Sequence, residues 1–289
     1  MHITKRTIHY TSLVTTRLRR HRFRNGTILI VNNTKINCEN TTYYIKNHIF
    51  YTNQKMLTLY FHPVSQPART VQWLMLARLV QNIDYKTEIL IPGSSKPNGT
   101  KSSAFLAKTG GIGTVPTLQL ESGACICDSN AILTYLAERF KWEDLYSSSL
   151  EQRSQINSLL HWHHANLRKV TTSRFAPLVR LDMKIPEDVM KNDFTIAQRA
   201  LRNIEARLSQ HRFICGDTVT LADFAASGEI IQCLPEFCDN INFDQYPAIL
   251  RWAQEMKKFP MFKESHAVLE KFATKLFKKN WIIANRSKL

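Results

Sequence analysis

The spacing of apolar residues changes character once along this chain, and that change limits the folds it can adopt. From Met56 onward, short strand-like runs alternate with helical spacings, a pattern typical of a small α/β domain. From Leu150 onward, only the helical spacing recurs. The sequence therefore predicts an α/β domain over residues 56–140, followed by an all-α domain over residues 150–280.

The same patterns place the individual elements. In the first domain we expect strands at 57–61, 85–90, 117–120 and 124–127, and helices at 67–80, at 103–108 and from residue 129. In the second domain we expect helices at 150–173, 187–210, 221–234, 247–258 and 261–279. Thr220 and Asp223 stand three residues apart before an apolar run, which predicts a capping box at a helix start.

The first 55 residues differ in composition from the rest. They hold ten Lys and Arg residues and a single acidic residue, Glu39, and so carry nine of the 16 net positive charges. Such a segment is a basic disordered extension, an organelle transit peptide, or sequence upstream of a true start at Met56, which we favour. We therefore exclude residues 1–55 from the predicted fold.

The composition of the remaining chain limits the classes of partner and ligand that we expect. Residues 56–289 contain 29 basic and 22 acidic residues, a mild excess that argues against nucleic acid as the main partner. No stretch approaches the roughly 18 uninterrupted apolar residues that a membrane span needs. The six cysteines form no CxxC pair and no zinc-type Cys/His pattern, so we predict isolated reduced thiols and no metal.

The stretch LTLYFHPVSQPAR (57–69) raises the first functional question. Ser65 lies between Pro63 and Pro67, where the predicted strand gives way to a helix. Proline is well placed in a first helical turn because its missing N–H has no partner there. Ser65 is therefore either a helix cap or an exposed hydroxyl available for chemistry.

A second candidate lies in the segment TVPTL. Pro116 cannot donate to a sheet, so it belongs at the start of the strand that follows. A cis Val115–Pro116 bond would present the backbone N–H and C=O of Val115 to a ligand. A trans proline at a strand start would have no such role.

A third candidate is the segment CDSNAI, where a strand gives way to a helix. The Ser129 hydroxyl and the first backbone N–H groups of the helix could hold a carboxylate, and Asp128 beside them could hold an ammonium group. The α-amino-acid end of a peptide carries both charges and fits this pair. The alternative is that Asp128 or Ser129 only caps the helix.

A serine turn, a Val-Pro pair, an acid–serine pair and a helical second half with a capping box follow one another in this chain. This order resembles the glutathione transferase family. The resemblance covers residues 56 to about 279 and implies a thioredoxin-like N-terminal domain, with a four-stranded mixed sheet and helices, and an all-helical C-terminal domain. The segments that resemble its theta class are LYFHPVSQPAR (59–69), LLHWHHANLR (159–168), FICGDTVTLADFAASGEIIQ (213–232) and FPMFKESH (259–266).

The resemblance also implies roles for individual residues. Ser65 matches the theta-class catalytic serine, whose hydroxyl donates a hydrogen bond to the glutathione sulfur. Arg168 matches a helix arginine near the active site, and we assign Arg168 and His164 to binding of the electrophilic substrate. The residues expected to bind glutathione are Gln66, Thr114, Val115, Pro116, Asp128 and Ser129.

The chain departs from the family pattern at two of these positions. Thr114 stands where the family commonly has a lysine that binds the glycyl carboxylate of glutathione, and the sequence does not identify a replacement for that lysine. Lys101 is a candidate for the glutathione contact that the family makes from the preceding loop (92–103). Asp128 stands where the family usually has Glu, so its side chain is one methylene shorter.

The implied activity is conjugation of the glutathione thiolate to electrophilic or halogenated small molecules, with glutathione as co-substrate, and reduction of organic hydroperoxides. A homodimer is expected from the same resemblance. The alternative is a non-catalytic transferase-like binding or interaction module. Intact Ser65, Asp128 and Ser129 favour the enzyme, whereas the missing lysine and the basic N-terminal arm favour the module.

Ser287, Lys288 and Leu289 have the sequence of a peroxisomal import address. The residues before them, from Ile283, are short and mixed in character, so we expect the import receptor to reach this address. We therefore expect a tail over residues 281–289 and a peroxisomal or cytoplasmic location. A compartment that makes peroxide can use a thiol-dependent hydroperoxide reductase.

A fluorescent protein fused upstream of Met56 tests this location. The fusion should concentrate in peroxisomes, because the receptor reads a free C-terminal Ser-Lys-Leu. The same fusion without residues 287–289 should stay in the cytosol. Imaging both fusions beside peroxisomal and mitochondrial markers decides the matter, and the expectation is wrong if both stay diffuse or both enter mitochondria.

Overall fold

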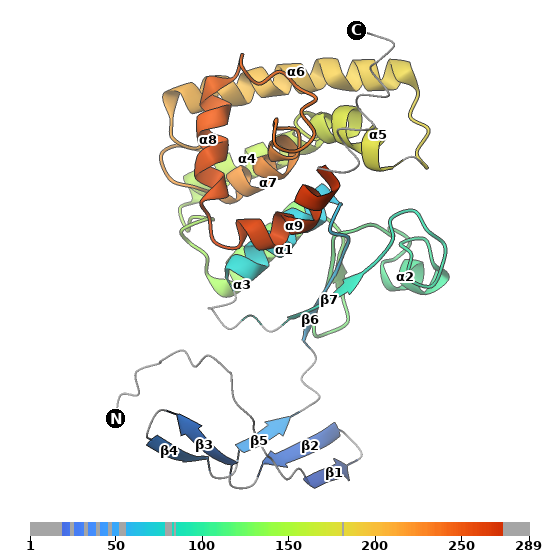
Figure 1. The fold of residues 1–289 in the computed structure, drawn as a ribbon, viewed down its shortest axis with the longest axis vertical. Helices are drawn as coiled ribbons and strands as arrows, with labels where there is room; N and C mark the ends of the chain where they lie inside the picture. Colours follow the sequence, from blue (N-terminus) through green and yellow to red (C-terminus); the bar gives the residue numbers. More distant parts are fainter. Residues whose placement is uncertain are drawn as a thin grey trace. The chain divides into compact units, whose positions relative to one another are not determined.

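The computed structural model describes residues 19–23, 26–31, 34–38, 41–45, 48–51, 56–78, 83, 85–180 and 182–273. The chain divides into two compact units, Met1–Lys55 and Met56–Leu289 (Figure 1). Among the described residues, every helix is too short or too polar to cross a membrane. The tail at 281–289, with its Ser-Lys-Leu ending, lies outside the described residues, so its role stays a prediction.

Five short strands are described in the first unit, which the sequence analysis left outside the predicted fold. Ile, Val, Thr and Tyr residues are frequent in these runs, and each two-residue segment between consecutive runs contains an asparagine, a residue that favours turns. One antiparallel sheet has the order β1 (Arg19–Phe23), β2 (Gly26–Val31), β5 (His48–Tyr51), and β3 (Thr34–Cys38) pairs antiparallel with β4 (Thr41–Ile45).

The second unit begins with the predicted four-stranded mixed sheet. Its strand order is β7-β6-β8-β9, and β6 pairs parallel with β7 but antiparallel with β8. All five residues of β6 are buried, as expected for a central strand. The elements in chain order are β6 (Leu57–Phe61), α1 (Gln66–Ala77), β7 (Tyr85–Ile89), α2 (Ser103–Lys108), β8 (Thr117–Gln119), β9 (Cys125–Ile126) and α3 (Ser129–Phe140). The predicted thioredoxin-like arrangement is confirmed.

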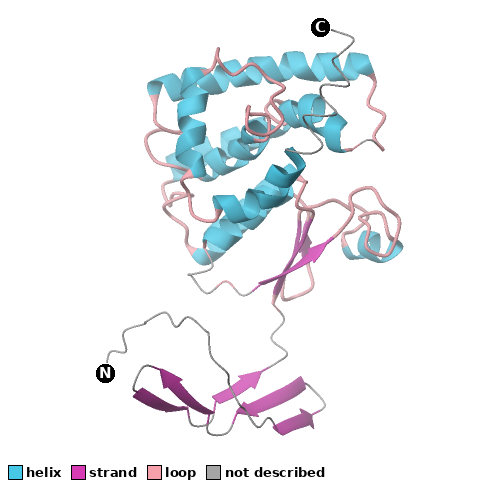
Figure 2. Ribbon diagram, in the orientation of Figure 1, coloured by secondary structure: helices cyan, strands magenta, loops and turns pink. Residues whose placement is uncertain are grey.

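The rest of the second unit is helical, which confirms the predicted all-helical domain (Figure 2). The helix expected at 150–173 ends earlier than predicted, because α4 stops at Ala165. The Asn166 side chain donates to the Trp162 carbonyl at 2.9 Å, and so takes the acceptor that its own backbone N–H would use in a continuing helix. The elements are α4 (Leu150–Ala165), a π-helical turn η2 (Thr171–Phe175), α5 (Ala176–Val179), α6 (Glu187–Gln210), α7 (Leu221–Ile231), α8 (Pro247–Lys257) and α9 (Phe262–Phe272).

Helix α7 lies at the centre of the helical domain and contacts α1, α3, α4 and α8. Every one of its residues is buried, and a helix buried on all sides is normally apolar all round. Two carboxylates nevertheless lie in it. Asp223 forms the predicted capping box with Thr220, whose N–H donates to Asp223 Oδ2 at 2.8 Å. The second carboxylate, Glu229, belongs to the site described below.

His266 on α9 is buried against α1. Its ring stacks on Phe262 at a centroid distance of 4.0 Å and meets Trp73 edge-on at 5.5 Å. Only 2% of the residue is exposed. Burial holds the pKa of His266 well below its ordinary value, and the charge of Arg69 acts in the same direction. His266 is therefore neutral in the folded protein at neutral pH.

The free energy of unfolding should fall as the pH drops below about 6.5, the ordinary pKa of histidine. Above that pH, His266 is neutral in the folded and unfolded states alike and adds no pH dependence. Below it, the unfolded chain takes up a proton that the folded chain resists, so this group lowers stability by up to about 1.4 kcal/mol per pH unit.

Denaturant unfolding of the wild type and of His266→Asn, from about pH 7 down to about pH 5, measures this effect. The variant should lose less stability per pH unit than the wild type, whatever its stability at neutral pH. Equal slopes in the two proteins would contradict the assignment.

Candidate active site

The turn that carries Ser65 joins β6 to α1. Ser65 is half-buried, its N–H donates to the His62 carbonyl at 2.9 Å, and its carbonyl accepts from the Arg69 N–H at 2.9 Å. The Ser65 hydroxyl does not cap α1, and it makes no hydrogen bond within the part of the chain that the structure describes. The hydroxyl is therefore available to a ligand.

A buried arginine contacts the backbone carbonyls of this turn. Arg69 is 1% exposed, and its Nη1 lies 3.4 Å from the Pro63 carbonyl and 3.5 Å from the Val64 carbonyl. Its Nη2 donates to Gln232 Oε1 on the far side, at 3.2 Å. Burial lowers the pKa of Arg69 to about 10, against the opposing effect of the Glu229 carboxylate, so the guanidinium stays charged at neutral pH.

Gln66, the residue after Ser65, is also buried. Its Oε1 accepts a hydrogen bond from Arg168 Nη1 at 3.0 Å, which ties the start of α1 to the helical domain. The side chain is thus engaged within the protein, and its expected contact with glutathione stays a prediction.

The acid–serine pair lies at the start of α3. Asp128 is the N-cap, and its Oδ1 accepts from the backbone N–H groups of Asn130 at 2.9 Å and Ala131 at 3.0 Å. Ser129 is buried at the first helical position, where a backbone N–H has no intrahelical partner. Its hydroxyl likewise makes no hydrogen bond among the described residues. Asp128 therefore performs the capping role, and Ser129 keeps two donors for a ligand.

The Val-Pro turn lies next to this helix start. The Val115–Pro116 bond is cis, and Pro116 is buried ahead of β8. Thr114 Oγ1 donates to the Cys127 carbonyl at 3.2 Å, and the Thr114 carbonyl accepts from Thr117 Oγ1 at 2.8 Å. The Thr114–Cys127 bond fixes the turn beside the residue that precedes Asp128. The Val115–Pro116 turn and the Asp128–Ser129 pair, which the sequence suggested separately, therefore lie together.

Lys101 reaches the loop that leads into the Val-Pro turn. Its Nζ donates to the Ile112 carbonyl at 3.4 Å and is solvent-exposed. An ammonium group therefore lies near the position where the family commonly has lysine, although it comes from a different part of the chain. The structure thus makes Lys101, which the sequence suggested only for a contact from its own loop, a candidate for the role of that lysine.

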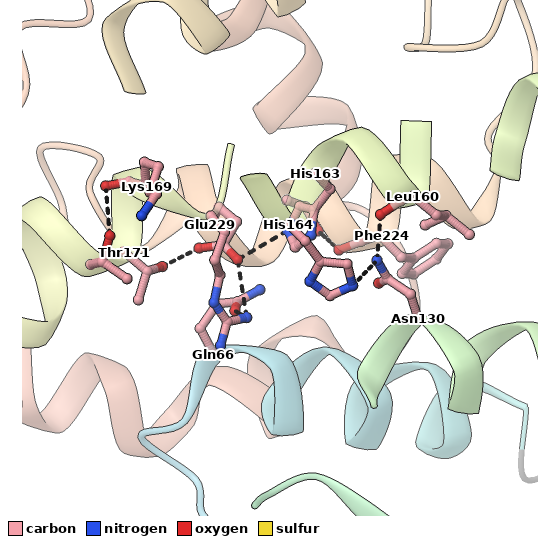
Figure 3. Close-up of polar contacts among 12 residues, drawn as sticks. Gln66, Asn130, Leu160, His163, His164, Lys169, Thr171, Phe224 and Glu229 are labelled. Atoms are coloured by element: carbon pink, nitrogen blue, oxygen red, sulfur yellow. Dashed lines mark hydrogen bonds and ion pairs between the residues drawn. The ribbon is translucent and has the colours of Figure 1, made fainter. Parts of the chain in front are cut away.

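The helical domain contributes two histidines to this region. His164 Nε2 lies 3.5 Å from Asp128 Oδ2. It also lies 3.3 Å from Asn130 Nδ2, which itself donates to the Leu160 carbonyl at 2.8 Å (Figure 3). Burial lowers the pKa of His164, and Asp128 acts against that effect. His163 points the other way and is 4% exposed, with Nε2 3.0 Å from Glu229 Oε1.

Arg168 lies in the irregular segment after α4. Its N–H donates to the His163 carbonyl at 2.9 Å, and its side chain is 30% exposed, so one side of the guanidinium faces solvent. The other side meets Gln66 and the buried carboxylate of Glu229, whose Oε1 lies 3.4 Å from Arg168 Nη1.

Sequence reasoning missed four residues of the buried polar network behind the serine turn, namely Glu229, Gln232, Thr171 and Arg69, of which Arg69 contacts the turn itself. One signal was present, since Glu229 is a charge within an apolar helix, and a buried carboxylate needs partners. Among the described residues, no three His, Cys, Asp or Glu side chains gather as they would around a metal ion.

Two family models match the second unit. The model for the N-terminal domain of glutathione S-transferase matches residues 59–144, and the model for the C-terminal domain matches residues 167–260. Human glutathione S-transferase theta-2B is 27% identical over 223 residues, which cover 74% of this chain and 86% of the relative. Chicken glutathione S-transferase theta-1 is 27% identical over 242 residues, with 74% and 88% covered. Dichloromethane dehalogenase from Methylophilus leisingeri is 25% identical over 202 residues, with 68% and 73% covered.

Solved structures agree with the family models. A human theta-class glutathione transferase, in complex with the glutathione conjugate of 1-menaphthyl sulfate, superposes with a TM-score of 0.63 and 25% identity, covering 78% of this chain and 91% of that one. Glutathione S-transferase unclassified 2 from Bombyx mori has a TM-score of 0.61 at 24% identity, with 77% and 98% covered. The chain therefore belongs to the glutathione S-transferase family, as a theta-like enzyme of that family.

Proposed function

We propose that this protein activates the thiol of glutathione through the Ser65 hydroxyl and transfers the thiolate to electrophilic small molecules. The observation that carries the proposal is the Ser65 hydroxyl, which has no hydrogen-bond partner among the described residues and lies in a turn whose carbonyls contact a buried arginine. A hydroxyl in this position can donate to a sulfur anion, and the N-terminus of α1 adds a favourable field for negative charge.

The energetics of one hydrogen bond suffice for this role. A free thiol has a pKa of about 8.5 and is mostly protonated at neutral pH. A hydrogen bond to a charged acceptor contributes roughly 1.5–3 kcal/mol, and about 1.4 kcal/mol corresponds to one pKa unit. Ser65 can therefore lower the thiol pKa by about one to two units, which makes the thiolate a major species near pH 7.

The other end of glutathione is a γ-glutamyl group with an α-carboxylate and an ammonium group. We assign the carboxylate to the two free donors of Ser129 at the start of α3. The Asp128 carboxylate caps the helix through Oδ1, and its Oδ2, which lies 3.5 Å from His164 Nε2, is assigned to the ammonium group. The backbone of Val115 is assigned to the cysteinyl part, and Lys101 to the glycyl carboxylate.

Arg168 and His164 are assigned to the electrophile, because both come from the helical domain and stay partly exposed. The relatives' names include a dehalogenase, and one solved relative holds a conjugate of an aryl-methyl sulfate. Halogenated molecules and sulfate esters share an anionic leaving group, which the cationic Arg168 side chain would stabilise. A homodimer is carried over from the family as part of the proposal.

The same thiolate would reduce organic hydroperoxides. The sulfur attacks the terminal peroxide oxygen, the O–O bond breaks, and the alkoxide takes a proton and leaves as an alcohol. A second glutathione then reduces the sulfenic acid, with formation of glutathione disulfide and release of water.

Retention on immobilised glutathione, followed by turnover of an alkyl or aryl halide or of cumene hydroperoxide, tests the function. The wild-type protein should be retained, should be released by free glutathione, and should turn over at least one of these substrates. A protein that is neither retained nor active contradicts the proposal and favours a non-catalytic interaction module.

Ser65→Ala should leave the fold and the glutathione affinity nearly intact, because one neutral hydroxyl adds little to binding of the protonated thiol. It should lower kcat/KM near neutral pH about 10- to 100-fold and move the pH profile upward by about one to two units. Ser129→Ala is the matched control, since it removes a hydroxyl at the other helix start. That variant should raise KM for glutathione without moving the pH profile, and wild-type kinetics in Ser65→Ala would refute the assignment.

Asp128 should show two separable roles. Asp128→Ala removes the cap and should lower the free energy of unfolding by about 1 kcal/mol, whereas Asp128→Asn keeps a good N-cap and should change it by only a few tenths. Both variants remove the charge assigned to the ammonium group, so both should weaken glutathione binding to a similar degree. Unfolding curves and titration calorimetry check this, and Asp128→Asn with wild-type affinity would limit Asp128 to capping.

A further inference from the structure

Glu229 is a fully buried carboxylate to which the proposed chemistry gives no role. It is 0% exposed near the end of α7, with Oε1 3.0 Å from His163 Nε2 and 3.4 Å from Arg168 Nη1. Its other oxygen, Oε2, accepts a hydrogen bond from Thr171 Oγ1. Figure 3 shows Glu229 between Thr171 and His163, with Gln66 on the α1 side. A buried charge is costly to leave unpaired, so these contacts hold their partners in fixed positions.

One set of contacts runs from Glu229 through Arg168 to Gln66, the residue after Ser65. Arg168 Nη1 contacts Glu229 Oε1 and also donates to Gln66 Oε1 at 3.0 Å. Because the Arg168 side chain is 30% exposed, it has room to turn toward solvent when its buried anion is removed. Such a movement would release Gln66 and, with it, the first turn of α1.

A second set of contacts runs from Glu229 through Thr171 and Gln232 to Arg69, which contacts the residues before Ser65. Gln232 Nε2 donates to Thr171 Oγ1 at 2.5 Å, and Gln232 Oε1 accepts from the buried Arg69 at 3.2 Å. Arg69 in turn lies against the carbonyls of Pro63 and Val64. Glu229 thus reaches the serine turn from both sides, through two separate sets of contacts.

We propose that Glu229 is a positioning residue for the Ser65 hydroxyl, and this inference rests on the proposed function of Ser65. Glu229 does not touch the ligand. It fixes Arg168 and Thr171, and these fix the two segments that flank Ser65, so that the hydroxyl meets the glutathione sulfur at hydrogen-bonding distance. A small displacement of the turn weakens that bond and leaves more of the thiol protonated.

Glu229→Gln tests the proposal, because it keeps the shape of the side chain and removes its charge. The measurement is the ultraviolet absorbance of the thiolate of bound glutathione as a function of pH. We expect the titration midpoint to rise by about half a pH unit or more, which lowers the thiolate-to-thiol ratio at a given pH about threefold. The dissociation constant for glutathione should stay within about twofold, because the γ-glutamyl contacts are unchanged.

Asp193→Asn is the matched control. Asp193 on α6 is 7% exposed, pairs with Lys169 Nζ at 2.8 Å and accepts from Thr172 Oγ1 at 2.6 Å. It therefore anchors the same segment after α4 through a buried carboxylate, but within the described part of the chain it forms no hydrogen bond or ion pair with Arg168, Gln66 or Arg69. Asp193→Asn should lower the melting temperature as a buried-carboxylate change does, and its thiolate midpoint should equal that of the wild type.

The outcomes separate this inference from the proposed function. A raised midpoint in Glu229→Gln, with an unchanged midpoint in Asp193→Asn, supports the positioning role. An unshifted midpoint in Glu229→Gln, or an equal shift in both variants, overturns it and leaves Ser65 catalysis standing. A wild-type protein that binds glutathione without lowering its thiol midpoint overturns the proposed function, and the inference with it.

If Glu229→Gln does not yield folded protein, Thr171→Val decides the question. Thr171 is only partly buried, and valine has nearly its shape, but the variant lacks the hydroxyl between Glu229 and Gln232. A smaller upward shift of the thiolate midpoint supports the proposal. A midpoint equal to that of the wild type overturns it.

Discussion

The close approach of α1 to α7 is the constraint on which the rest of the site depends. It occurs at Gly228, where a Cβ atom would lie 2.4 Å from Gln66 Nε2 and 2.4 Å from Thr70 Oγ1. A Cβ atom there would require the Gln66 and Thr70 side chains to shift, so glycine lets these side chains of α1 pack directly against the backbone of α7. Since Ser65 immediately precedes α1, this contact holds the helix that follows Ser65 against the helical domain.

From this contact the arrangement of the site follows. Gln66 comes within reach of Arg168, and Arg69 comes within reach of Gln232, so charged and amide groups fill a region that would otherwise be apolar. The α/β domain supplies the donors assigned to glutathione, at the starts of α1 and α3. The helical domain supplies the side chains that hold those starts in place, together with the partly exposed Arg168 and His164.

Local patterns in the sequence were sufficient to predict much of the fold and the place of Ser65 in it. The order of strands and helices from 57 to 140, the capping box of Thr220 and Asp223, and the place of Ser65 at a strand–helix junction all depend on residues a few positions apart. Such short-range preferences are readable from composition and spacing. The mixed sheet and the identity of the site then came from the family resemblance that these features carry.

Contacts between distant residues could not be predicted in the same way. Arg69 and Gln232 lie 163 positions apart, and Thr171 and Glu229 lie 58 positions apart, so no local spacing relates them. The end of α4 at Ala165 was missed because the apolar period continues past Asn166, whose amide competes for a backbone acceptor. The strands between residues 19 and 51 were missed because the basic composition was weighed above the regularly spaced asparagines.

The central claim is that the Ser65 hydroxyl holds the glutathione sulfur. A crystal structure of the protein with glutathione bound tests it most directly. The sulfur should lie within hydrogen-bonding distance of Ser65 Oγ, with the γ-glutamyl carboxylate on the Ser129 hydroxyl and N–H. A structure in which glutathione is bound, but its sulfur contacts a different donor and leaves Ser65 unpaired, would contradict the account.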